Sequence, residues 1–159
     1  MRATLAGFVI VMAGATVSAQ SQPAPPAAPA PGSPATYRSA EALASALKTA
    51  KGTPGGMTTA AISNTDQYRI NIVHRARAAG AIAHAGNTEL HYIIEGSGTV
   101  VTGGTIVPGA DGKPASITNG VTQKVVKGDV IIVPSNSPHW YSQIDSTITY
   151  LEVRWPAPK

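Results

Sequence analysis

The pattern of apolar and polar residues changes near Met57. Beyond this point, short runs rich in β-branched residues alternate with Gly, Asn, Asp and Pro, which is the pattern of strands joined by turns. Many short strands at this spacing predict an antiparallel sandwich or barrel over residues 57–159, and therefore an all-β fold. The runs expected to form strands are residues 58–63, 68–76, 89–94, 98–102, 115–118, 123–126, 129–133, 140–143 and 147–154.

The segment before these strands has a helical pattern. Residues 39–51 have a helix-forming composition, Ser39 is a suitable N-cap, and Leu43 and Leu47 fall on one helical face. A cluster of glycines then ends the pattern. We therefore expect residues 37–56 to form a short N-terminal helix and a turn.

The beginning of the chain has the features of a secretory signal peptide. Residues 1–19 carry Arg2 as their only charge, an apolar run over 5–15, and a small-x-small sequence that ends at Ala19. We expect cleavage after Ala19 and a periplasmic or secreted protein without membrane attachment. An uncleaved membrane anchor is the alternative, but the apolar run is short for a bilayer span. Residues 20–36 form a Pro/Ala-rich linker that cannot bury a core.

Composition excludes several kinds of site. The chain has no cysteine, so disulfides, thiol nucleophiles and thiolate metal ligands are absent. Its net charge is +4, but the Lys and Arg residues are scattered and aromatic residues make up only 5% of the chain. Nucleic-acid binding needs a basic cluster or aromatic stacking platforms, so we expect no nucleic-acid partner. Any metal must be held by histidine, carboxylate or water.

Candidate chemistry is concentrated around the strand expected over residues 89–94. Because side chains alternate along a strand, Glu89 and His91 point to the same face, one pleat apart. His84 precedes them, and a second apolar run followed by a turn leads to His139. An inward-facing Glu89 would be costly as an unpaired charge, and a metal or a cationic partner would offset that cost. His84, Glu89 and His91 are therefore a possible metal-binding cluster, and the two stretches suggest one site built from both.

The spacing of these residues resembles the two motifs of the cupin superfamily. The fold of that family is a double-stranded β-helix, or jelly-roll barrel, in agreement with the strand pattern. The resemblance implies one divalent metal ion (Zn, Mn, Fe or Ni) held by His84, Glu89 and His139. The positions that match are His84, Glu89 and Gly96 in the first motif, and Gly128, Pro134 and His139 in the second.

The likeness is incomplete at four motif positions. In the first motif, Ile82 replaces the leading histidine and Ala76 stands at the position of the early glycine, with Gly80 nearby. In the second, Asn136 and Gln143 replace a glycine and the closing asparagine. The three remaining ligands would leave coordination positions open for water, substrate or dioxygen, as a catalytic metal requires. Alternatively, His91 completes the set as a fourth ligand.

His91 also has a catalytic role open to it. Its strand is similar to the Glu-x-Arg-Tyr/Phe strand of acireductone dioxygenases, in which the residue two positions after the metal-binding glutamate faces the substrate. A histidine there could serve as general acid or base, because histidine titrates near neutral pH. Both the ligand and the acid–base role stay open, and His91 and Glu89 are the expected catalytic residues.

Three further residues are candidates for a pocket wall. Tyr141 and Gln143 share the strand face of His139, which makes them candidate substrate-binding residues. His74 follows an apolar strand face that includes Ile72, so we interpret it as a core or pocket-wall histidine.

These features predict an exported, metal-dependent cupin enzyme that acts on a small oxygenated organic substrate by proton transfer, as a lyase or isomerase. Iron is harder to keep ferrous outside the cytoplasm, which favours this chemistry over oxygenation. Two alternatives remain: a cupin dioxygenase, and a barrel that binds a sugar or another small ligand without turnover. A homodimer is compatible with each of these functions.

Overall fold

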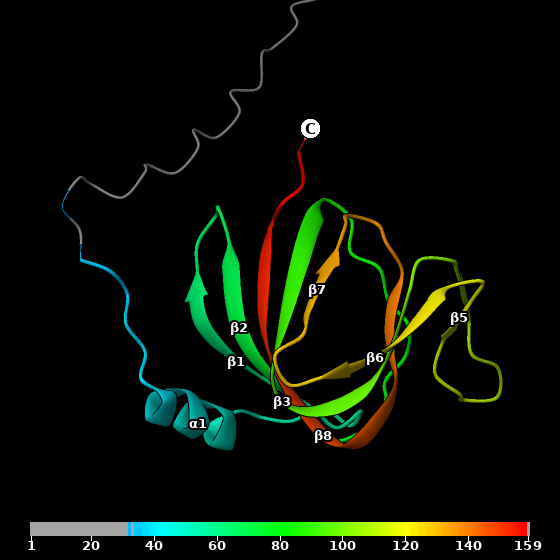
Figure 1. Cartoon of the computed structure of the whole chain (residues 1–159), viewed down its shortest axis with the longest axis horizontal. Helices are drawn as coiled ribbons and strands as arrows, with labels where there is room; N and C mark the ends of the chain where they lie inside the picture. Colours follow the sequence, from blue (N-terminus) through cyan, green and yellow to red (C-terminus); the bar gives the residue numbers. More distant parts are fainter. Residues whose placement is uncertain (1–31, 33, 159) are drawn as a thin grey trace, which may run out of the picture. The chain divides into compact units, whose positions relative to one another are not determined.

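The runs of β-branched residues form the strands of a barrel (Figure 1). The computed structural model describes residue 32 and residues 34–158, so the predicted signal peptide and most of the predicted linker lie outside the described residues. The described elements are α1 (Ala40–Thr49), β1 (Met57–Asn64), β2 (Arg69–Arg75), β3 (Asn87–Thr102), β4 (Thr105–Val107), β5 (Ser116–Thr118), β6 (Val121–Val126), β7 (Val130–Val133) and β8 (His139–Pro156).

Most of the strands belong to one sheet that curves around a common interior (Figure 1). Its order is β1-β2-β8-β3-β6, β7 also pairs with β3, and all of these pairings are antiparallel. The short strands β4 and β5 form a separate ribbon. This arrangement confirms the predicted all-β class and is consistent with a jelly-roll barrel, in which strands far apart in sequence, such as β2 and β8, are neighbours.

Two strands are longer than the sequence pattern indicates. The expected strands 89–94 and 98–102 are both parts of β3, and 140–143 and 147–154 are both parts of β8. The two long strands pair with each other, with bulges where the register shifts. A bulge inserts an extra residue without ending the pairing, so the residues that resembled turns lie inside bent strands.

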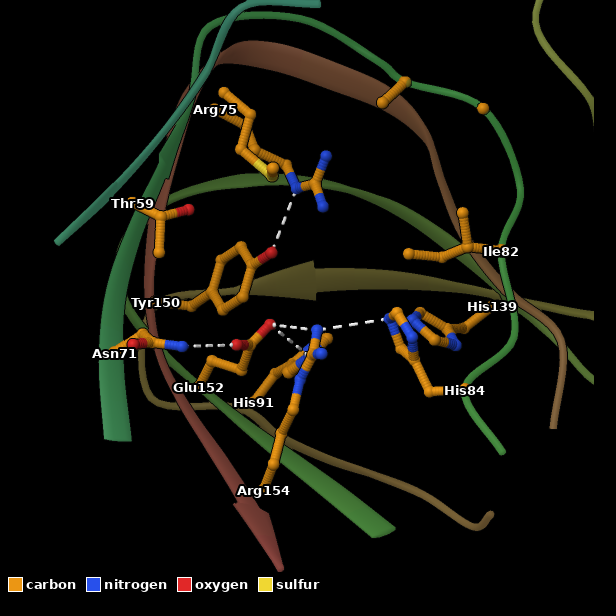
Figure 2. A pocket seen from close by; sticks show the side chains of 13 residues that line it. Thr59, Asn71, Arg75, Ile82, His84, His91, His139, Tyr150, Glu152 and Arg154 are labelled. Carbon is orange, nitrogen blue, oxygen red and sulfur yellow. Dashed lines mark hydrogen bonds and ion pairs between the residues drawn. The ribbon is translucent and has the colours of Figure 1, made fainter. Parts of the chain in front are cut away.

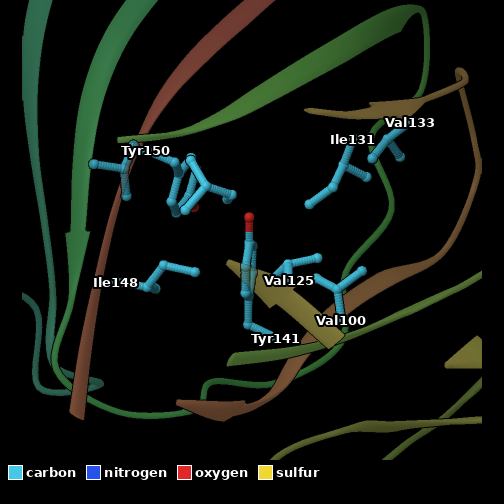
Figure 3. Packing of buried hydrophobic residues seen from close by; sticks show 9 residues of the cluster. Val100, Val125, Ile131, Val133, Tyr141, Ile148 and Tyr150 are labelled. Carbon is cyan, nitrogen blue, oxygen red and sulfur yellow. The ribbon is translucent and has the colours of Figure 1, made fainter. Parts of the chain in front are cut away.

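The apolar core fills part of the barrel interior (Figure 3). Ile93 from β3 and Ile148 and Tyr150 from β8 are fully buried. Complete burial of one such apolar side chain contributes about 1.5–3 kcal/mol. Tyr150 also lines the pocket described below, so it marks where the core meets the polar interior. The cluster consists of Val73, Ile93, Val100, Val125, Ile131, Val133, Tyr141, Ile148 and Tyr150.

Helix α1 forms where the sequence pattern predicts it. Ser39 is the N-cap, and its hydroxyl oxygen accepts a 3.1 Å hydrogen bond from the backbone N–H of Ala42. Leu43 and Leu47 line a groove between the helix and the outer face of the sheet, beside Ile72. Among the described residues, no helix has the length and hydrophobicity needed to cross a membrane.

The structure places His74 on the face of β2 that is turned away from the interior pocket. Asn71 and Arg75 line the interior pocket, whereas Ile72 and His74 line the groove beside α1 on the opposite face. Nδ1 of His74 is 3.0 Å from the hydroxyl oxygen of Thr149. His74 therefore lines the groove beside the helix and not the interior pocket, because the apolar face of this strand turns toward α1 while its more polar face turns inward.

Candidate metal centre

Glu89 and His91 lie in the barrel interior, as the alternation along β3 predicts. Glu89 is 1% exposed and His91 is 2% exposed, and they share a strand face with the buried Ile93. Tyr92 points the other way and is exposed. β3 thus places a carboxylate and an imidazole side by side in the interior.

A short backbone bridge brings His84 and His139 to the same place. Ile82 and His139 exchange two backbone hydrogen bonds, of 3.1 and 2.9 Å, and the N–H of Asn136 donates to the carbonyl oxygen of His84. These bonds join the loop before β3 to the turn before β8. Asn136 has φ 62°, a left-handed conformation that asparagine tolerates better than most residues. This explains how Asn136 can occupy the glycine position of the second motif.

Three of the four predicted metal ligands, His84, Glu89 and His139, converge. Nε2 of His84 is 3.6 Å from Oε1 of Glu89, and Nε2 of His139 is 3.8 Å from Oε2 of Glu89. One ligand atom from each residue lies within 4.8 Å of the others. Atoms bound to a shared Zn²⁺ at about 2.1 Å are roughly 3.4 Å apart in tetrahedral geometry, so small adjustments would suffice.

A hydrogen bond prepares His139 to act as a ligand. Its Nδ1 is 3.2 Å from the carbonyl oxygen of Ser137. Because a carbonyl oxygen only accepts, Nδ1 carries the proton and Nε2 presents its lone pair to the cluster. Burial lowers the pKa of His139 below its ordinary value, although the Ser137 bond and the charge of Glu89 oppose this shift. The neutral form that binds metal is thereby favoured.

His91 is held between Glu89 and Tyr141. Its Nε2 is 3.3 Å from Oε2 of Glu89, and its Nδ1 is 3.1 Å from the hydroxyl oxygen of Tyr141. An ionised carboxylate only accepts, so Nε2 donates to Glu89 and Nδ1 accepts from Tyr141. In this tautomer His91 orients Glu89. A second group that could hold a metal, Glu89, His91 and Glu152, requires Nε2 to give up that proton.

Two charged residues of β8, Arg154 and Glu152, also enter the cluster (Figure 2). Nη2 of Arg154 donates to Oε2 of Glu152 at 3.0 Å and to Nε2 of His84 at 3.2 Å. Its Nε lies 3.4 Å from Oε2 of Glu89. Arg154 is therefore a cationic partner that offsets the burial of Glu89.

The charge of Glu89 is maintained in this environment. Burial alone would raise the pKa of Glu89, but the hydrogen bond from His91 and the electrostatic interactions with His139, Arg154 and His84 together hold it below the ordinary value. Glu89 is therefore ionised at neutral pH, as a metal ligand must be.

These residues fit a divalent metal, with Arg154 as a competitor. Two imidazoles and one carboxylate form a ligand set that first-row metals accept, and His139 offers a free lone pair. Arg154 occupies the lone pair of His84, so a metal would have to replace that bond. Within the described part of the chain, the buried Nε of Arg154 has no hydrogen-bond partner. An unsatisfied buried donor makes the present position of the guanidinium less favourable.

The cluster forms part of the wall of a pocket of about 450 Å³ (Figure 2). This volume lies within the range of roughly 300–1,000 Å³ that is typical of small-molecule sites. Ile82, at the position of the missing motif histidine, also lines it. The polar and charged lining includes Asn71, Arg75, His84, His91, His139, Glu152 and Arg154.

The two predicted substrate-binding residues do not line this pocket. Tyr141 is buried in the apolar core, where its hydroxyl group donates to His91. Gln143 is exposed, and its amide donates to Asp145 at 3.1 Å. The register of β8 shifts between Tyr141 and Gln143, so the alternation is interrupted by a bulge. The prediction that Gln143 faces inward is therefore wrong.

Sequence reasoning missed Arg75, Glu152 and Arg154. The alternation of side chains along β8 could have indicated two of them, because Glu152 and Arg154 lie on the same strand face as the fully buried Ile148. A strand pattern alone does not say which face of a sheet is inside, so these charges could equally have faced solvent.

Comparison with known proteins identifies the family. The family model described as Cupin matches residues 53–151, which is more than half of the chain. The chain belongs to the cupin family. The matched region contains all four predicted metal ligands and ends just before Glu152.

Solved structures resemble this cupin in fold but share little sequence. FeII HppE matches with a TM-score of 0.52 and 16% identity, over 69% of this chain and 57% of that chain. KdgF from Halomonas sp. matches with a TM-score of 0.50 and 12% identity, over 69% of this chain and 87% of that one. The nucleoside dehydratase Pac13 matches with a TM-score of 0.50 and 13% identity, over 71% and 81%. No curated protein matches the chain.

Proposed function

We propose that this cupin is an exported, metal-dependent enzyme that acts on a small oxygenated organic substrate by proton transfer, as a lyase or isomerase. The convergence of His84, Glu89 and His139 beside His91 carries the proposal, because the three histidines line a 450 Å³ pocket. The similar structure of a nucleoside dehydratase supports it to the extent that this fold can accommodate elimination chemistry.

The site divides into a metal-holding part and a proton-transferring part. A divalent ion held by His84, Glu89 and His139 would supply a Lewis acid for the oxygens of the substrate. We assign proton donation to His91, which lines the pocket: its doubly protonated form would give the Nε2 proton to the substrate and keep the proton on Nδ1. Tyr141 fixes the orientation of the ring through Nδ1, and Glu89 stabilises the charged form of the imidazole.

A non-catalytic binding protein is the second candidate function. The bond from Arg154 to His84 favours it, because the guanidinium already satisfies part of the charge that a metal would balance. A cupin dioxygenase would use the same ligand set as the lyase or isomerase, so the identity of the bound metal separates these two enzymes.

Elemental mass spectrometry on the full-length, untagged protein tests the proposal. We expect near-stoichiometric divalent metal in the wild type and its loss in Glu89→Gln and His139→Ala. Glu95→Gln is the matched control, because Glu95 lies on the same strand but is exposed. Zinc or manganese would support the lyase or isomerase, and iron would favour the dioxygenase. Absence of metal, even after titration with metal ions, would contradict the proposed enzyme and favour the non-catalytic binding protein.

Export is a separate part of the proposal and is supported by the pattern of residues 1–19. We expect the periplasmic or secreted protein to begin at Gln20 when its amino terminus is determined by mass spectrometry. A chain that keeps Met1 and stays with the cells would contradict export.

A homodimer is supported by exposed apolar side chains on one face of β3 and β7. Tyr92 pairs in register with Val130, and Ile132 follows on the same strand face. Exposed apolar side chains that lie together favour association. Light scattering on the purified protein should give the mass of two chains.

A further inference from the structure

Arg75 is a buried cation in the pocket wall with most of its donors unused. It ends β2, is 9% exposed and lines the pocket. Its Nε donates to the hydroxyl oxygen of Tyr150 at 3.0 Å. Among the described residues this is the only hydrogen bond of its side chain, so both terminal nitrogens are free. Figure 2 shows the guanidinium extending over the pocket, away from Glu152 and Arg154.

Arg75 also lacks a carboxylate partner. None of the ion pairs in the described part of the chain involves Arg75, whereas Arg154 contacts both Glu89 and Glu152. The guanidinium carbon lies 5.2 Å from the ring centre of Tyr141 and 5.9 Å from that of Tyr150. Such cation–π contacts offset only part of the cost of burying a charge. An anion in the pocket would supply the missing counter-charge.

The geometry of Arg75 favours one kind of anion. The bond to Tyr150 fixes the guanidinium and leaves its two terminal nitrogens as a planar pair of donors. Such a pair matches the two oxygens of a carboxylate. Arg154 is neutralised by its own carboxylates, so the pocket offers one free positive charge, which suits a singly charged carboxylate better than a phosphate. We propose that Arg75 anchors a carboxylate group of the substrate.

The role of Arg75 in catalysis rests on the proposed function. If that function holds, the substrate is a small molecule that carries a carboxylate. That group would bind Arg75 while the oxygen-bearing part of the molecule reaches His84, Glu89 and His139. Arg75 is then a specificity-determining residue, and its binding role can be measured without turnover.

Three probes that share a phenyl ring test this role: benzoate, benzamide and phenyl phosphate. Their dissociation constants would be measured by ligand-observed NMR with the full-length protein at about 0.15 M salt, where exposed charges are largely screened. We expect benzoate to bind roughly tenfold tighter than benzamide, and tighter than phenyl phosphate. Arg75→Met should weaken benzoate binding about 10- to 100-fold and leave benzamide binding nearly unchanged.

Arg69→Met is the matched control, because Arg69 lies on the same strand, is exposed and does not line this pocket. Arg75→Gln, which keeps a polar group near Tyr150, replaces Arg75→Met if that variant does not fold. Equal binding of benzoate and benzamide to the wild type would overturn the proposal. So would a benzoate preference that survives substitution of Arg75, or tighter binding of phenyl phosphate.

Metal content measured on the same samples separates this proposal from the proposed function. Metal-free protein with Arg75-dependent benzoate binding would uphold the anchor and contradict the metalloenzyme. Metal-loaded protein that does not distinguish benzoate from benzamide would support the metalloenzyme and contradict the role of Arg75 as an anchor.

Discussion

At the scale of single residues, Glu89 connects all parts of the candidate centre. Its carboxylate oxygens lie 3.3 to 3.8 Å from nitrogens of His84, His91, His139 and Arg154. A divalent ion would compete with Arg154 for the same oxygens and for the lone pair of His84. These few contacts therefore determine whether the guanidinium of Arg154 or a metal ion occupies the site.

Arg154→Met should increase the affinity for a divalent metal. The substitution removes a positive charge beside Glu89 and frees Nε2 of His84. Two unit charges at 4 Å interact by about 1 kcal/mol in water and by more in protein, so we expect roughly tenfold tighter binding of the doubly charged Zn²⁺. Calorimetric titration with Zn²⁺ measures this, with Arg69→Met as the charge-matched control. Weaker binding would mean that Arg154 instead organises the ligands.

Tyr141 and Tyr150 should make the folded state sensitive to alkaline pH. Burial raises the pKa of Tyr150 to about 12, although Arg75 lowers it in part, and burial also raises the pKa of Tyr141. An unfolded tyrosine has a pKa of about 10. Because the folded pKa is higher, the contribution to stability is complete below about pH 10 and is lost as the pH rises toward 12.

Urea unfolding at a series of pH values from about 8 to 11 measures this loss. We expect the free energy of unfolding to fall at the upper end of the range, and to fall less steeply in Tyr150→Phe, which has no phenol to ionise. An equal slope in the two proteins would contradict the assignment to Tyr150.

At the scale of secondary-structure elements, β3 connects the candidate metal ligands to the apolar core. Glu89 and His91 occupy its first half, and Val100 packs in the core from its second half. Between them, Gly96 has φ 81°, and a Cβ at this position would collide with the carbonyl oxygen of Thr147 on β8. Only glycine allows the two long strands to approach this closely at the bulge.

Gly96→Ala should therefore destabilise the barrel by about 2–4 kcal/mol, from the left-handed conformation and the collision combined. Gly103→Ala is the matched control, because Gly103 has φ 70° but nothing within 4 Å of its Cβ position. That variant should lose only about 1–2 kcal/mol. Chemical denaturation of both variants gives the comparison, and equal losses would show that contact with β8 is unimportant.

At the scale of the whole molecule, the barrel joins three distant segments in one centre. His84 comes from the loop before β3, Glu89 from β3 itself, and His139 from the start of β8. A ligand set of this kind exists only in the folded chain, so the binding of a metal there would be coupled to folding.

Added Zn²⁺ should therefore raise the melting temperature. At a free concentration of about one hundred times the dissociation constant, binding stabilises the native state by about 2.7 kcal/mol, or roughly 10–20 °C for a barrel of about 100 residues. Thermal unfolding followed by circular dichroism measures the shift, which a chelator should reverse. Glu89→Gln should show little shift, and an equal shift in that variant would place the metal elsewhere.

Much of the fold could be predicted from local sequence patterns. The cap at Ser39, the alternation along 89–94 and the β-branched runs each depend on residues within one element, and they predicted the helix, the strands and the inward direction of Glu89 and His91. The spacing of His84 and His139 could be interpreted because the family resemblance supplied a barrel in which these residues meet.

Tertiary contacts decided the rest. On β2, the apolar face packs beneath α1 and the face of Arg75 turns inward, which alternation alone cannot determine. On β8, a bulge turns Gln143 outward, while Arg154 reaches Glu89 from the opposite end of the strand. The physical reason is that local periodicity describes two faces of a strand, whereas register, bulges and burial arise from pairing between strands that are far apart in the chain.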